Sequence, residues 1–252
     1  MSWRSTTLVR GGLRCAEYRE DPGFPVVRWE LPVPHVVVLV RLGDPPVDDL
    51  PPAAVLSPRA PVVLAHHGST HHVQARLPPT TAYRLFGPLG DLAGHPVPLD
   101  AILPPGLPDR LAEAPDRLAT LAAALTEAAH RGPEPDPEVR HAWTMLRAGT
   151  PVAEVIAETG WSRNRLVRRF AAQTGFTPKA AASLMRFHRA TRLLGAAPLT
   201  EIAATGGYYD QAHLNRAFRR YAGSTPTEWL RARVPGLPGA GVSSKTGGPG
   251  EP

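Results

Sequence analysis

The sequence of 252 residues contains a single cysteine, Cys15, which excludes an intramolecular disulfide and a cysteine-rich zinc site. It also lacks a long apolar run. The longest aliphatic stretch, Val36–Val40, is far too short to cross a bilayer, and residues 1–12 have no apolar signal core. We therefore expect a cytoplasmic protein with no membrane partner.

Signatures of catalysis are absent too. We find no Gly-x-Ser-x-Gly, no Walker phosphate loop and no metal triad, so the sequence predicts neither an enzyme nor a cofactor. One cluster resembles a metal site: His66, His67, His71 and His72. Strand neighbours point to opposite faces, so at most two of the four histidines converge across a hairpin, and no cysteine or neighbouring acid completes a ligand shell. We predict no metal there and leave open whether the cluster binds anything else.

Charge is unevenly divided along the chain. The whole sequence has 28 Lys and Arg against 22 acids. Residues 1–135 have 12 Arg, no Lys and 14 acids, a net of −2, whereas residues 136–252 have 16 Lys and Arg and 8 acids, a net of +8. Such asymmetry is typical of a nucleic-acid-binding half joined to a half of another kind. An ordinary solvated basic surface is the alternative.

Thirty prolines divide the chain into segments. Short strands are expected at Val26–Leu31, His35–Leu42, Pro61–His67 and His72–Leu77, with a turn at Gly68-Ser69 before the last. Leucines at helical spacing, from Leu111 to Leu125, predict a helix over 109–130, and three prolines between 131 and 137 mark a domain boundary. The sequence thus predicts an α+β protein with a β-rich regulatory domain at 1–107, a helical segment at 108–130 packing on it or at a dimer interface, a linker at 131–137, an all-α domain at 138–233 and a disordered tail at 234–252.

The all-α domain contains an internal repeat. Seven markers recur at an offset of 48 residues: Ser162/Asp210, Leu166/Leu214, Arg168/Arg216, Phe170/Phe218, Gly175/Gly223, Thr177/Thr225 and Pro178/Pro226. The first pair are helix N-caps, the leucines and phenylalanines form buried i,i+4 pairs, and the glycines close each helix. Thr-Pro then restarts a helix, and Glu228 completes a capping box in the second copy.

A shorter helix precedes each copy, at Pro151–Thr159 and Leu199–Thr205, and each ends in a glycine, Gly160 or Gly207. Helix, glycine turn, helix is the helix-turn-helix pattern, and Pro178–Leu194 can form one helix between the two units. The second helix of such a unit enters the major groove of DNA. Its outward residues here suit base edges: Arg163, Asn164, Val167, Arg168, Gln211, His213, Asn215 and Arg216. Five further basic residues are better placed for phosphates: Arg165, Arg169, Lys179, Arg219 and Arg220.

On these residues the segment Val155–Arg233 resembles the DNA-binding domain of the AraC/XylS family. The resemblance rests on Gly160-Trp-Ser162 with Leu166 and Phe170, on Gly175 with Pro178, and above all on the run from Ile202-Ala203 through Gly207-Tyr-Tyr-Asp-Gln-Ala-His-Leu214 to Phe218, Gly223 and Pro226. It implies seven helices, two helix-turn-helix units joined by a long helix, and adjacent major grooves on one face of DNA. It also implies base-facing positions at Asn164, Val167, Arg168, Gln211, His213, Asn215 and Arg216.

One departure puts the first unit's base contacts in doubt. Four residues before the turn glycine the family has a small residue, as at Ala203, but the first unit has Ile156.

More weakly, Ala82–Gly87 and Asp116-Arg117-Leu118 make the amino-terminal half similar to the family's regulatory domains, with a cupin-like fold. We expect a sequence-specific transcription factor that binds double-stranded DNA, with RNA polymerase as partner. An effector in the amino-terminal domain and a homodimer stay open, and the alternative function is a non-specific or architectural DNA-binding protein.

Overall fold

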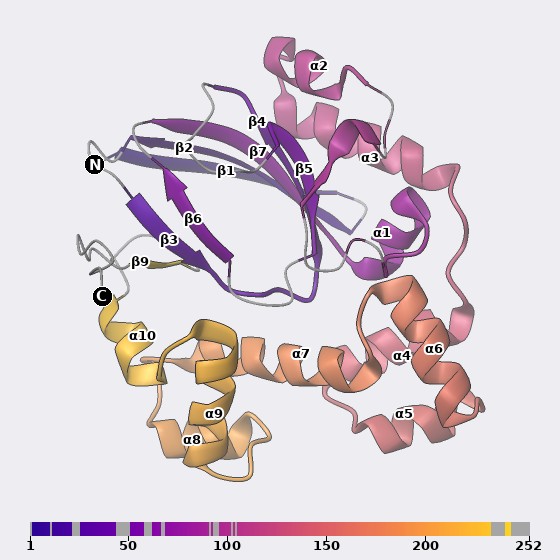
Figure 1. Ribbon diagram of the computed structural model, residues 1–252, viewed down its shortest axis with the longest axis vertical. Coiled ribbons are helices and arrows are strands. Elements are labelled where there is room, and N and C mark those ends of the chain that lie inside the picture. The colour runs from indigo at the N-terminus through magenta and orange to yellow at the C-terminus, as the bar shows by residue number, and fades with distance from the viewer. Residues whose placement is uncertain are drawn as a thin grey trace, which may run out of the picture.

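The computed structural model describes residues 2–10, 12–21, 26–43, 51–57, 62–66, 69–90, 92, 96–101, 103, 105–232 and 240–242. In Figure 1 the amino-terminal part forms β-sheets with helices beside them, and the region from residue 137 onward is built from helices. The predicted α+β class with a β-rich first domain and an all-α second domain is confirmed. Among the described helices, none has the length and apolar character that crossing a membrane requires.

The described strands of the β-rich part form two antiparallel sheets. The larger has the strand order β1-β2-β7-β4-β5-β8, and the smaller has the order β6-β3-β9. The strands are β1 (Ser2–Arg10), β2 (Leu13–Asp21), β3 (Val26–Glu30), β4 (Val36–Arg41), β5 (Ala53–Leu56), β6 (Val62–His66), β7 (Thr70–Leu77), β8 (Val97–Pro98) and β9 (Ala240–Val242). The four strands expected from the sequence form within a few residues of their expected ranges, whereas β1, β2, β5 and β8 were not expected.

The hairpin expected around Gly68-Ser69 does not form between its two flanking strands. β6 pairs with β3 in the smaller sheet, while β7 lies between β2 and β4 in the larger one. Gly68 lies outside the described residues. The reason is that β7 is paired along both of its edges: with β2 from Arg14 opposite Arg76 to Glu20 opposite Thr70, and with β4 from Val36 opposite Leu77 to Arg41 opposite His72. The histidines of β6 and β7 therefore do not face each other across a hairpin.

The described residues of the amino-terminal part also form three helices and a 3₁₀ turn: α1 (Pro79–Phe86), η1 (Leu99–Ala101), α2 (Leu107–Glu113) and α3 (Arg117–His130). The single helix expected over 109–130 is in fact two, because Pro115 lacks a backbone N–H and Asp116 caps a new helix by accepting from the Ala119 N–H at 2.9 Å. Leu118, Leu121 and Leu125 are buried with sheet residues in one core. The leucine stripe of α3 thus faces its own sheet.

The carboxy-terminal part contains the seven helices that the sequence predicted. They are α4 (Pro137–Ala148), α5 (Val152–Thr159), α6 (Arg163–Thr174), α7 (Pro178–Leu193), α8 (Leu199–Thr205), α9 (Gln211–Ala222) and α10 (Pro226–Ala232). Figure 1 shows α7 running between two groups, α4 to α6 at one end and α8 to α10 at the other. The expected disordered tail lies mostly outside the described residues, but its residues 240–242 form β9 and pair with β3, so that expectation does not hold for them.

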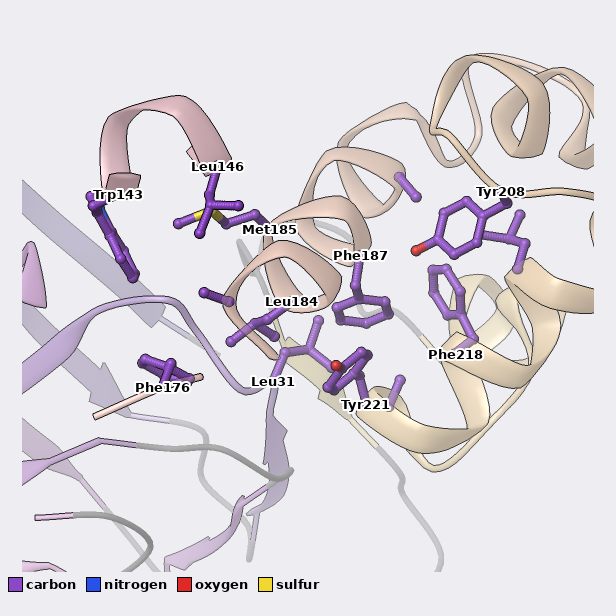
Figure 2. Packing of buried hydrophobic residues seen from close by; sticks show 14 of the residues in the cluster. Leu31, Trp143, Leu146, Phe176, Leu184, Met185, Phe187, Tyr208, Phe218 and Tyr221 are labelled. Atoms are coloured by element: carbon purple, nitrogen blue, oxygen red, sulfur yellow. The ribbon is translucent and has the colours of Figure 1, made fainter. Parts of the chain in front are cut away.

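The core of the helical domain runs the length of α7. At one end Trp143 of α4 stacks on Phe170 of α6, with ring centroids 5.9 Å apart. At the other end Phe187 of α7 meets the rings of Phe218 and Tyr221 of α9 at 4.9 and 5.0 Å (Figure 2). Both groups of helices are thereby packed on one connecting helix.

Candidate nucleic-acid interface

The two halves of the repeat fold into matching helix pairs, α5 with α6 and α8 with α9. In each pair a glycine in the left-handed region makes the turn, Gly160 at φ 65° and Gly207 at φ 75°. A side chain with a β-branch would be strained at such angles, so glycine fits both positions. The sequence pattern of helix, glycine turn, helix is therefore present twice in space.

The ends of the second helices are fixed by the predicted caps. Ser162 Oγ accepts from the Arg165 N–H at 3.3 Å, and Asp210 Oδ1 accepts from the His213 N–H at 2.6 Å. These side chains satisfy backbone donors that a helix leaves without partners in its first turn. At the other end Gly175 and Gly223 take φ values of 75° and 68°. The two helices thus start and stop at equivalent residues.

Each of these helices buries one stripe. Leu166 and Phe170 of α6 and Leu214 and Phe218 of α9 have no exposed surface. A helix turns by about 100° per residue, so side chains two positions from a buried leucine point about 160–200° away from the core. Arg168 and Arg216 each lie two residues after such a leucine and are exposed. The repeat therefore presents the same face twice, with an arginine at its centre.

In the first unit all four base-contact candidates are exposed: Arg163, Asn164, Val167 and Arg168. Val167 is 36% exposed, which is high for a large aliphatic side chain. The departure at Ile156 is visible as well: this side chain is half-buried against the core, whereas the matching Ala203 is fully buried.

The second unit is less uniform. Gln211 and Arg216 are exposed, but His213 and Asn215 are half-buried. The Nδ1 of His213 accepts from the Tyr209 N–H at 3.3 Å, and its ring lies edge-on to Tyr208 at 5.1 Å. The Asn215 Oδ1 is buried and has no hydrogen-bond partner among the described residues. These two side chains are therefore folded toward the protein surface.

Three of the five residues expected at phosphates already have partners within the chain. The Arg165 guanidinium lies 4.3 Å above the Trp161 ring. Arg169 binds the Asp136 carboxylate through two hydrogen bonds of 2.7 and 2.8 Å, and its bond holds the pKa of Asp136 below the usual value. Lys179, Arg219 and Arg220 are exposed, with the Arg220 guanidinium 5.3 Å from the Tyr221 ring.

Sequence reasoning missed one surface residue of this region. Tyr209, in the turn directly before the Asp210 cap, is 94% exposed. At the repeat offset of 48 it corresponds to Trp161, which is half-buried under Arg165. The same offset pairs Arg165 with His213, and both side chains lie against the turn of their unit. Extending the repeat alignment to positions 161 and 165 would have revealed both correspondences.

The histidine cluster is dispersed. His71 Nε2 lies 2.6 Å from Glu17 Oε1, and the His72 ring stacks on Tyr18 at 5.1 Å. The acid beside His71 comes from β2, far away in sequence, and was not anticipated. His66 ends β6 in the other sheet, and His67 lies outside the described residues. Within the described ranges no three His, Cys, Asp or Glu side chains are grouped as a metal ion would need.

Comparison with known proteins identifies the helical domain. Residues 155–232 match the family model described as "Helix-turn-helix domain". An AraC-like transcription regulator of Streptomyces antibioticus is 33% identical over 117 residues, which are 46% of this chain and 34% of that protein. The HTH-type transcriptional regulator MtrA of Neisseria gonorrhoeae is 29% identical over 82 residues, which are 32% of this chain and 27% of MtrA. The matches thus span about a third or less of these relatives.

Solved structures give similar matches over the same share of the chain. The DNA-binding domain of AdpA, in complex with a target DNA, is 30% identical, covers 40% of this chain and 95% of that chain, and has a TM-score of 0.34. The C-terminal domain of AraT, a response regulator from Geobacillus stearothermophilus, is 24% identical with a TM-score of 0.38, over 40% of this chain and 90% of that one. The helical domain of this chain is a helix-turn-helix domain of the AraC type, as its sequence predicted.

Proposed function

We propose that this chain is a sequence-specific transcription regulator that reads two adjacent major grooves on one face of double-stranded DNA with α6 and α9. One observation supports this most strongly: a helix with an equivalent N-cap occurs at each end of α7 (Figure 1), and the two helices have Arg168 and Arg216 at matching outward positions. The 16 residues of α7 are about 24 Å long at 1.5 Å per residue. A rigid spacer of that length suits neighbouring grooves, whose repeat is about 34 Å.

The exposed residues of this face have the chemistry of base readout. Arginine pairs with the two acceptors of guanine, so we assign Arg168 and Arg216 to guanines at equivalent positions of the two grooves. Asn164 and Gln211 offer the amide pair that matches adenine, and Val167 suits a thymine methyl group. We assign contacts to Arg163, His213 and Asn215 as well. The last two must first turn away from the protein surface, since they are half-buried.

The phosphate contacts fall to basic residues around this face. Lys179, Arg219 and Arg220 are exposed and carry charge that would set affinity and register rather than sequence preference. Arg165 can reach a phosphate from its place above Trp161. We propose that Arg169 serves mainly to hold the linker, because its Nε and Nη2 already donate to the two carboxylate oxygens of Asp136.

The named relatives support the regulatory role. Both curated proteins are transcription regulators, and the AdpA domain was solved with a target DNA. By that likeness we propose a cytoplasmic regulator with RNA polymerase as a partner and an amino-terminal domain that responds to an effector. We propose no catalytic activity, since the relatives matched are regulators rather than enzymes.

The test starts from selection of binding sites out of random-sequence duplexes by the full chain, followed by affinities for single-base variants of the selected site. We expect Arg216→Ala to lose about 1–3 kcal/mol on the selected site and to relax preference at one base pair. Arg220→Ala should weaken all sequences alike and reduce the slope of log affinity against log salt by about 0.9.

Either of two results would contradict the assignment. If Arg216→Ala weakens every variant equally, Arg216 is a phosphate contact. If selection enriches no sequence and affinity depends on salt alone, the chain is a non-specific or architectural DNA-binding protein. No binding to any duplex at low salt would refute the DNA-binding role itself.

A further inference from the structure

One residue from the amino-terminal part is built into the core of the helical domain. Leu31 directly follows β3, is 8% exposed, and is the one described residue before the linker that belongs to the helical core cluster. Figure 2 shows Leu31 between Leu184 of α7 and Tyr221 of α9. At this junction the Tyr221 hydroxyl also bonds the Ser183 hydroxyl of α7 at 3.0 Å. We call α6 and α9, which are proposed to enter the DNA grooves, the reading helices. Leu31 therefore fills the space where the second reading helix, α9, meets the connecting helix, α7.

The next residue is held by a hydrogen bond to the same connecting helix. The Nε2 of His188 in α7 lies 2.6 Å from the Pro32 carbonyl oxygen. A carbonyl only accepts, so Nε2 carries the hydrogen and donates it. Burial lowers the pKa of His188 and lowers that of the nearby His35 to about 4. Both imidazoles are thus neutral near pH 7, and the neutral His188 keeps this bond without a charge to solvate.

The amino-terminal part also contacts the first helix-turn-helix unit and the linker before it. The Leu89 N–H, just after α1, donates at 2.9 Å to the Ala172 carbonyl in the last turn of α6, where a helix carbonyl has no N–H donor within its own helix. Arg84 of α1 binds Glu134 of the linker at 3.0 Å. The linker passes so close that a Cβ at Gly132 would lie 1.5 Å from the Arg84 carbonyl oxygen. Only glycine fits there.

We infer that Leu31 is a positioning residue that fixes the angle between the two reading helices. Among the described elements α5 and α6 make no extensive contact with α8 or α9, so the two units are joined chiefly through α7. The amino-terminal domain touches both ends of this connection, at Ala172 of α6 and at the α7–α9 junction. The amino-terminal domain thereby holds the two reading helices at one angle, and we call this pair of contacts the brace. The effect of the brace on the spacing between DNA half-sites rests on the proposed function.

The brace is tested without DNA by the distance between spin labels on the two reading helices of the full chain. Asn164→Cys and Ala212→Cys place labels at equivalent, exposed positions, and the buried Cys15 stays unlabelled because its thiol is inaccessible. We expect one narrow distance distribution in this parent and in Val33→Ala, a control in the same loop outside the core cluster. Leu31→Ala should lose the single peak. An unchanged distribution in a folded Leu31→Ala protein would overturn the inference.

If Leu31→Ala does not fold, His188→Ala is measured instead and should broaden the distance distribution. His188→Gln should restore the narrow peak, because its side-chain amide N–H can donate to the Pro32 carbonyl. Equal distributions in the labelled parent, His188→Ala and His188→Gln would overturn the inference. The DNA consequence is measured on selected sites with one base pair inserted between the two half-sites, a rotation of about 34°. The unlabelled chain with its own Asn164 and Ala212 should lose affinity on the order of tenfold, and the unlabelled Leu31→Ala variant much less. If no site can be selected, the proposed function fails while the label distances still decide the brace.

Discussion

Replacing Leu214 with alanine tests the register of the second reading helix. Leu214 has no exposed surface and lies in the core cluster with Phe218 and Ile202. Removing a fully buried leucine side chain to the β-carbon costs about 2–5 kcal/mol, through lost burial and the cavity left behind. For a domain of about 100 residues each kcal/mol lowers the midpoint of thermal unfolding by about 4–8 °C. Leu214→Ala should therefore unfold at least about 8 °C below the parent.

The measurement is thermal unfolding of the full chain by circular dichroism at 222 nm together with tryptophan fluorescence. Trp229 packs on Phe218 with ring centroids 6.5 Å apart and so reports on the same unit. Leu193→Ala is the matched control, since it removes the same atoms from a side chain that is 38% exposed. A change below about 0.5 kcal/mol, or one equal to the control, would show that Leu214 does not face the core.

Three further predictions concern domain boundaries and buried or paired groups. A fragment of residues 136–233 should fold by circular dichroism and bind DNA at low salt, since Leu31 is the one described core residue that it lacks; an unfolded fragment would refute the boundary. Arg169 lowers the pKa of Asp136 below its usual 3.8, so this contact stabilises the fold above that pH, and its contribution is lost as pH falls through the lowered value. Unfolding free energies between pH 5 and 2 should therefore decline more steeply in the parent than in Arg169→Ala, and parallel curves would contradict this. Burial raises the pKa of Cys15 to about 11, so a thiol reagent at pH 8 should react with it only after denaturant is added; prompt reaction in the native state would disprove its burial.

Most of the helical domain could be predicted because its signals are local. A cap, a buried i,i+4 pair and a closing glycine each act within one or two turns, and all recur at one offset in the sequence. The ranges expected for α8 and α7 agree with the structure to within one residue. The capping box is present as well: the Thr225 N–H donates to Glu228 at 2.7 Å, and Thr225 Oγ1 accepts from the Glu228 N–H at 3.3 Å.

The amino-terminal part could be predicted only in pieces because its pairings are distant in sequence. β2 pairs with β7 between residues 50 to 62 positions apart in the sequence, and no local pattern specifies that register. The leucine spacing predicts one continuous helix over 109–130, but Pro115 divides this segment into α2 and α3. The packing of Leu31 in the core of the helical domain could not be predicted either, because its neighbours in the sequence are those of a strand end.

The surface of the two reading helices differs in a way that constrains the DNA they recognise. Arg168 and Arg216 are equivalent, exposed, and have no ion pair or ring contact among the described residues, so both half-sites should share a guanine at the matching position. The positions around them do not match. Asn164 corresponds to Ala212, which offers no hydrogen bond, and Val167 corresponds to Asn215, which exchanges a methyl contact for an amide. If α6 and α9 read DNA as proposed, their unequal faces would select half-sites that share one base pair and differ on its flanks, whereas two copies of one identical unit would select identical half-sites.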